Sequence, residues 1–110
     1  VEVMVVHEQG LVLREVMNYP NPMRENTTFT FIANREMDVR IKIYTISGQL
    51  IRTLEYPSAR SGFNMVEWDG LDEDGDVPAN GVYLYKVIAR GQGTAGVEQK
   101  EIVGRLAVIR

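Results

Sequence analysis

The sequence contains no cysteine among its 110 residues. This excludes disulfides, thiol catalysis and thiolate metal sites, so packing alone must hold the fold together. No apolar run approaches the roughly 20 residues that cross a bilayer, and we therefore expect a chain that does not span a membrane. The net charge of −3 provides no basic surface for a phosphate backbone, which argues against nucleic acid as a partner.

Groups for catalysis are also scarce. His7 is the only histidine, and no serine nucleophile motif lies near it, so acyl transfer would have no base. The letters G-x-G-x-x-G occur at Gly91–Gly96, but a dinucleotide site also needs a helix that opens there and an acidic residue about 20 positions later. We therefore predict a protein that is not an enzyme and has no cofactor, with a flexible, glycine-rich hairpin loop at Gly91–Gly96.

Strand patterns dominate what is present. Asp38–Ile46 alternates apolar and polar residues, as a half-buried antiparallel strand does, and Ser47-Gly48 turns it back into Gln49–Tyr56 as a hairpin. The composition of Val97–Val103 is also compatible with a helix. The other strand candidates are Val3–Val6, Leu11–Met17, Thr27–Ala33, Phe63–Asp69, Gly81–Arg90 and Val97–Arg110. Short strands with frequent turn signals predict an all-β, immunoglobulin-like antiparallel sandwich of about seven strands.

The predicted domain occupies residues 18–110, and residues 1–17 are a lead-in segment or strand from an upstream region. Val1 stands where an initiator Met would be, which predicts that the chain is cut from a longer protein. Strand alternation places a set of large apolar side chains inward: Phe29, Phe31, Ile41, Ile43, Leu54, Trp68, Tyr83, Tyr85 and Val87. Trp68, Tyr83 and Tyr85 could instead form a carbohydrate platform, but aromatics on the strands of a small sandwich more often lie in the core.

Gly70–Asn80 is predicted to be a long acidic turn. The carboxylates around it suggest a weak calcium candidate, for which we name Asp69, Asp72 and Asp74. The register of a helix–loop–helix calcium loop fails, because placing Gly75 sixth leaves glycines at the first and twelfth positions. We therefore favour a turn in which Asp and Gly serve the backbone, and we expect no specific metal site.

Several segments, in this order, resemble one family. The chain is similar to the C-terminal sorting domain of type IX secretion cargo, which shares an immunoglobulin-like fold with the flagellar hook-capping protein. The resemblance lies in the "YPNP" of Asn18–Pro22, the strand Thr27–Phe31, the hairpin Val39–Leu54, Trp68–Gly70 with Asp72 and Gly75, the "GVYLY" of Gly81–Tyr85, and the basic–apolar–basic end Arg105–Arg110.

The resemblance implies that the domain directs its parent protein from the periplasm across the outer membrane of a Gram-negative bacterium. The implied partners are the outer-membrane export machinery with its shuttle protein and a sortase-like peptidase. The parent would then be attached to the cell surface or secreted. Arg105 stands where the family commonly has Lys, and Ala107 replaces a larger aliphatic residue. With the additions Val1–Met17 and Gly91–Lys100, these departures leave open a domain retained on a machinery component such as the sortase itself.

The resemblance also names candidate signal residues at the end of the chain. A final strand without following chain can offer its edge and a free carboxylate to a receptor, which is a known mode of peptide recognition. The candidates for contact with the export machinery are Arg105, Leu106, Val108, Ile109, Arg110, Gly81 and Tyr83. Two alternatives remain: a structural spacer or assembly module, and a carbohydrate- or calcium-binding accessory domain of a surface hydrolase.

Overall fold

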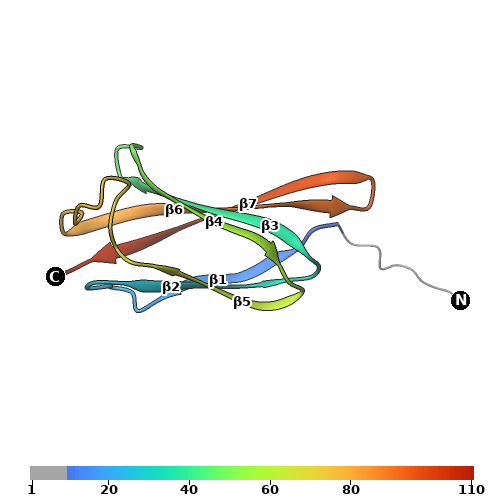
Figure 1. Cartoon of the computed structure of the whole chain (residues 1–110), viewed down its shortest axis with the longest axis horizontal. Coiled ribbons are helices and arrows are strands. Elements are labelled where there is room, and N and C mark those ends of the chain that lie inside the picture. The colour runs from blue at the N-terminus through green and yellow to red at the C-terminus, as the bar shows by residue number, and fades with distance from the viewer. Residues whose placement is uncertain (1–9) are drawn as a thin grey trace, which may run out of the picture.

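The computed structural model describes residues 10–110, which form two packed layers of β-strands (Figure 1). The strand candidate Val3–Val6 and His7 lie outside the described residues. In chain order the strands are β1 (Leu13–Tyr19), β2 (Thr27–Ala33), β3 (Met37–Thr45), β4 (Leu50–Ala59), β5 (Gly62–Trp68), β6 (Gly81–Gly93) and β7 (Gly96–Val108). Within residues 10–110, no helix is long and apolar enough to cross a membrane.

The strands form a three-stranded sheet with the order β1-β2-β5 and a four-stranded sheet with the order β4-β3-β6-β7. Every strand pair is antiparallel. Tight hairpins build β3–β4 and β6–β7, while the connections from β2 to β3 and from β5 to β6 cross between the sheets. The predicted class, an all-β immunoglobulin-like sandwich of seven strands, is confirmed.

The core lies between the two layers, and it contains the whole set of side chains that alternation placed inward. Trp68, Phe29 and Phe31 are completely buried. The Phe29 and Tyr85 rings meet edge to face across the sandwich, with their centroids 4.9 Å apart, a geometry that aromatic pairs prefer. Because Trp68, Tyr83 and Tyr85 are all buried, they do not form an exposed carbohydrate platform.

Gly104 shapes the packing of the last strand. It pairs with Tyr85, whose ring lies directly over the glycine, so that a Cβ at position 104 would lie 2.4 Å from the phenol oxygen. Burial raises the pKa of Tyr85 above its usual value. The missing side chain at Gly104 therefore provides the space that the Tyr85 ring occupies.

The β6–β7 hairpin differs from the sequence prediction. The hairpin expected at Gly91–Gly96 is confirmed, but the flexible loop over all these residues is wrong, because β6 continues to Gly93 and β7 begins at Gly96, which leaves a two-residue turn. Gly96 has a φ of +112°, which only glycine adopts without strain and which lets so short a turn close. The helical alternative for Val97–Val103 is also wrong, since these residues belong to β7. β1 begins at Leu13, inside the stretch that the sequence analysis set apart as a lead-in.

We predict that Trp68→Ala destabilises the domain by roughly 3–5 kcal/mol, because it empties a completely buried site. Phe63→Ala on the same strand is the matched control: Phe63 points outward and is 62% exposed, so its loss should change stability by less than about 0.5 kcal/mol. Urea unfolding of both variants measures the difference. A near-neutral Trp68→Ala would contradict the core assignment.

Candidate functional site

The end of β7 places the candidate signal residues on two sides of the sheet. Leu106 and Val108 point inward and are 1% and 0% exposed. Tyr83, opposite Leu106 on β6, is also buried, and its hydroxyl donates to the Ala79 carbonyl at 2.6 Å. These three side chains are therefore part of the core. The surface at this end consists of the exposed candidates Gly81, Arg105, Ile109 and Arg110.

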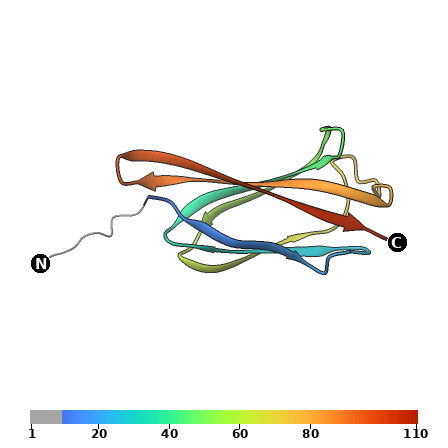
Figure 2. The ribbon, with the colours of Figure 1, turned by 180° about the vertical axis from the view of Figure 1, so that it is seen from behind.

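The edge of β7 is not free where the sequence analysis expected it to be. The segment Asn21–Met23, which links β1 to β2, lies along this edge (Figure 2). The Met23 amide donates to the Ala107 carbonyl at 2.8 Å, and the Ile109 amide donates to the Met23 carbonyl at 2.9 Å. The expectation of an open edge from residue 105 onward is wrong, because Met23 pairs in parallel with Val108 and fills it.

The Asn21 side chain extends this pairing by one more residue. Its amide nitrogen donates to the Arg105 carbonyl at 3.2 Å, and its oxygen accepts from the Ala107 amide at 3.0 Å. A side-chain amide thus takes the place of a strand backbone. Asn18 helps to hold it, since the Asn18 side-chain oxygen accepts from the Asn21 nitrogen at 3.3 Å. Thr27 completes the turn by donating to the Pro20 carbonyl at 2.9 Å.

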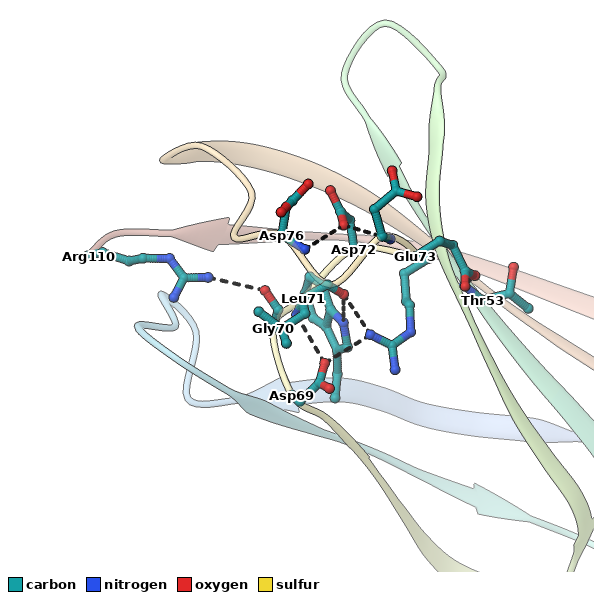
Figure 3. A network of polar contacts seen from close by, with 11 residues as sticks. Thr53, Asp69, Gly70, Leu71, Asp72, Glu73, Asp76 and Arg110 are labelled. Atoms are coloured by element: carbon teal, nitrogen blue, oxygen red, sulfur yellow. Dashed lines mark hydrogen bonds and ion pairs between the residues drawn. The ribbon is translucent and has the colours of Figure 1, made fainter.

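Arg110 is anchored on both its backbone and its side chain. Its amide donates to the Asn80 side-chain oxygen at 3.1 Å, and its guanidinium donates to the Gly70 carbonyl at 3.2 Å (Figure 3). Although Arg110 is exposed, these two hydrogen bonds hold this end of the chain in place. We call the surface formed by Asn21–Met23, Gly70, Asn80 and Arg105–Arg110 the C-terminal corner.

The turn that presents the Gly70 carbonyl requires a glycine at this position. Its φ is +79°, and a Cβ there would lie 2.0 Å from the Glu25 carbonyl oxygen, so no other residue fits. The Leu71 carbonyl accepts from both the Trp68 indole at 2.9 Å and the Arg52 guanidinium at 2.7 Å. The "WDG" sequence therefore connects the core to the carbonyl that binds Arg110.

Asp69 secures the same turn from outside. Its carboxylate accepts from the Leu71 amide at 3.0 Å and from Arg52 at 2.9 Å. The Leu71 amide, with help from the Arg52 charge, holds the pKa of Asp69 below its usual value despite some desolvation. Asp69 is thus occupied with loop building and lies apart from the acidic cluster that follows.

The acidic loop brings together Asp72, Asp74 and Asp76, whose carboxylates lie within 4.8 Å of one another. This is not the set named from the sequence, because Asp76 takes the place of Asp69. One oxygen of Asp72 accepts from the Asp74 and Asp76 amides, both at 2.9 Å. The loop also covers the outer edge of β4, where the Glu73 amide donates to the Ile51 carbonyl at 2.8 Å. These bonds account for the Asp72 carboxylate as a turn builder.

Sequence comparison gives the family. The profile of the FlgD Ig-like domain matches residues 23–93, more than half of the chain. The chain belongs to the FlgD Ig-like domain family. No curated protein matches the sequence.

Solved structures extend the relationship to other members of this fold. The chain resembles dimeric latent PorU from Porphyromonas gingivalis with a TM-score of 0.71 and 24% identity, covering 90% of this chain and 9% of PorU. It resembles PorZ, an essential bacterial surface component of the type IX secretion system of the same organism, with a TM-score of 0.55 and 27% identity over 87% of this chain and 12% of PorZ. It also resembles FlgD from Xanthomonas campestris, a protein of flagellar hook capping, with a TM-score of 0.55 and 21% identity, covering 91% of this chain and 70% of FlgD. The chain thus spans about a tenth of the length of PorU and PorZ.

Sequence reasoning missed Asn21, Met23, Gly70 and Asn80 as members of the corner. Asn21 lay within the "YPNP" motif and Gly70 within "WDG", so the motifs carried a signal, but their contact with the last strand did not follow from it. Met23 and Asn80 had no such signal, because nothing in the local sequence points to partners in Ala107–Arg110.

We predict that the stability difference between wild type and Asp69→Asn depends on pH. A carboxylate whose pKa is lowered by folding stabilises the fold above its unfolded pKa of about 3.9, and this contribution is lost as the pH falls through the folded pKa. Asp69→Asn should therefore cost about 1 kcal/mol near pH 7 and much less near pH 3. Asp74→Asn is the control and should cost less than about 0.5 kcal/mol at pH 7. A cost for Asp69→Asn that does not change between pH 7 and pH 3 would contradict the role of the charge.

We also predict that Asn21→Ala loosens the edge of β7 locally. The Ala107 amide loses its acceptor, so its hydrogen exchange should accelerate about tenfold or more, while global stability falls by only about 1 kcal/mol. Exchange measured by NMR should leave the amides in the centre of β3 unchanged after correction for global stability. Equal acceleration across the whole domain would show that Asn21 has no specific role at this edge.

Proposed function

We propose that this domain is a C-terminal sorting module that directs its parent protein across the outer membrane through type IX secretion, and that the export machinery recognises the C-terminal corner. The observation that carries the proposal is the convergence of the motifs on the last strand. The "YPNP" segment supplies Asn21, the "WDG" turn supplies Gly70, and the residue before "GVYLY" supplies Asn80. Three of the motifs that make the chain resemble a sorting domain, "YPNP", "WDG" and "GVYLY" with the Asn80 before it, therefore contact the end of the chain.

The likeness to PorZ supports the cellular setting, because PorZ is a surface component of the type IX system. In this proposal the parent passes through the periplasm and ends at the cell surface or outside the cell. The role is recognition and not catalysis. Retention of the domain on a machinery component remains compatible with the same recognition.

The geometry limits which groups of the C-terminal corner a receptor could contact. A receptor cannot add a strand to the edge of β7 beyond Arg105, because Asn21 and Met23 already occupy it. We therefore propose that the receptor contacts the exposed side chains of the folded corner, Arg105, Ile109 and Arg110. Leu106, Val108 and Tyr83 contribute indirectly, by fixing the strand in the core.

We predict that Arg110→Ala and Arg105→Ala each leave the domain folded and leave the parent in the periplasm. Arg110→Ala removes one part-buried hydrogen bond to the Gly70 carbonyl, so the unfolding free energy should fall by about 1 kcal/mol. Lys100→Ala, an exposed cation at the other end of β7, is the matched control and should be exported normally. Cell fractionation with surface immunolabelling measures delivery, and thermal unfolding measures the fold.

Normal surface delivery of both arginine variants, with folded domains, would overturn the sorting proposal. That result would favour the second candidate, a spacer or assembly module. The FlgD family match is the observation behind this alternative. A spacer would tolerate any change of exposed side chains at the corner, so the same experiment separates the two functions.

A further inference from the structure

The outer face of the three-stranded sheet is apolar, although the outer faces of sandwich sheets are usually polar. Four of its side chains are large, apolar and exposed: Met17 53%, Tyr19 78%, Phe63 62% and Met65 59%. Strand pairing arranges the outward positions in three rows that cross β1, β2 and β5. We call these three rows together the apolar face. From one end of the sheet to the other, the rows are Arg14–Ile32–Phe63, Met17–Thr30–Met65 and Tyr19–Thr28–Glu67.

The exposure of Phe63 and Met65 is fixed by the register of β5. Asn64, between them, points inward and is 3% exposed. The side-chain nitrogen of Asn64 donates to the Arg60 carbonyl at 2.8 Å, and its side-chain oxygen accepts from the Arg60 backbone amide at 3.1 Å. The strand therefore buries an asparagine that closes the β4–β5 turn and exposes its apolar neighbours. A shift by one residue would bury Phe63 at the cost of leaving Asn64 without these partners and moving Trp68 out of the core.

The other sheet provides an internal comparison. Its outer face carries charged residues such as Arg40, which pairs with Glu55 at 3.1 Å, and Lys86, which pairs with Glu101 at 3.7 Å. Exposed Met and aromatic side chains gathered on one face of a small domain are typical of a surface that binds another protein. The outer face of the four-stranded sheet also exposes Val82 and Val103, but these lie among charged side chains, whereas exposed Met17, Phe63 and Met65 gather on the three-stranded sheet.

The charges at the corners of the apolar face are self-complementary. Arg14 on β1 and Glu67 on β5 lie at diagonally opposite corners, with the apolar side chains between them. Two copies can stack face to face about a two-fold axis that lies between the faces and runs diagonally to the strands. Each Arg14 then lies over Glu67 of the second copy. The strands of the two copies cross at a steep angle, as in orthogonally packed sheets. Because the interface is isologous, this contact occurs twice.

Both charges are available for such a contact. Among residues 10–110, Arg14 forms an ion pair only with its neighbour Glu15, at 2.7 Å, and both side chains are 59% exposed. A pair so exposed contributes little, so Arg14 can exchange it for a new partner. Glu67 has no ion pair among residues 10–110.

We propose that the apolar face is a homodimer interface, in which two copies stack these faces with Arg14 opposite Glu67. The proposal is independent of the sorting function. The face is smaller than the roughly 20–30 residues a side of a standard interface, so we expect a weak dimer, with a dissociation constant on the order of 100 µM.

Sedimentation velocity on the whole chain, over a concentration range up to about 1 mM, tests the proposal. Wild type should shift from monomer to dimer. Phe63→Ser and Met65→Ser should weaken association about tenfold or more and leave the melting temperature nearly unchanged, since both side chains are exposed. Val103→Ser, which removes a 61% exposed valine from the outer face of the other sheet, is the control and should dimerise as wild type.

Charge exchange tests the arrangement itself. Arg14→Glu and Glu67→Arg should each weaken the dimer about tenfold, and the double variant should restore it to within about threefold of wild type. A wild-type chain that stays monomeric up to about 1 mM would overturn the proposal and leave the face to a different partner. A dimer that is insensitive to Phe63→Ser, or charge variants that do not rescue each other, would also overturn it.

Discussion

The structure depends on closing the edges of its four-stranded sheet. The outer strands of an open sheet present unpaired amides and carbonyls, which attract other chains unless they are covered. Here the C-terminal end of β7 is covered by Asn21–Met23, and the first residues of β4 are covered by the acidic loop, through the Glu73 amide and the Ile51 carbonyl. Both covering segments belong to connections that start or end in the other sheet, so the same hydrogen bonds that close the edges also hold the two layers together.

This constraint gives the family motifs a physical meaning. A short turn containing two prolines cannot continue either strand, and it leaves Asn21 and Met23 free to pair with β7 instead. The turn at Gly70 acts just beyond the end of β7, where its carbonyl accepts from the Arg110 guanidinium. Motifs that lie far apart in the sequence therefore act together to set the position and orientation of the last strand.

The sequence predicted the strands and the core because both depend on local alternation. Thr27–Ala33 was correct to the residue, since each step of two places Phe29 and Phe31 on one face and no other register buries both. The corner could not be found in this way. The bonds from Asn21 to Arg105 and Ala107 join residues 84 and 86 positions apart, and nothing in either segment alone indicates its partner.

Asp69 shows, for a single side chain, the same limit of prediction from local sequence. From composition alone, a carboxylate beside glycines can be an ion ligand or a turn builder; the sequence analysis favoured the turn but named Asp69 among the weak calcium candidates. The position of Arg52 decides between them, because β4 brings this guanidinium within 2.9 Å of the Asp69 carboxylate. That proximity follows from the packing of β4 beside the β5–β6 connection, which is a property of the whole sandwich.

Recognition at the corner and association through the apolar face make different demands on the domain, and the fold separates them. The Arg105 side chain belongs to β7 and points away from the core on the outer face of the four-stranded sheet. The apolar face belongs to the other sheet, on the opposite side of the sandwich. A second copy stacked on Phe63 and Met65 would therefore leave Arg105 accessible. Because the two surfaces share a core but no exposed side chains, substitutions on one should act on the other only through stability.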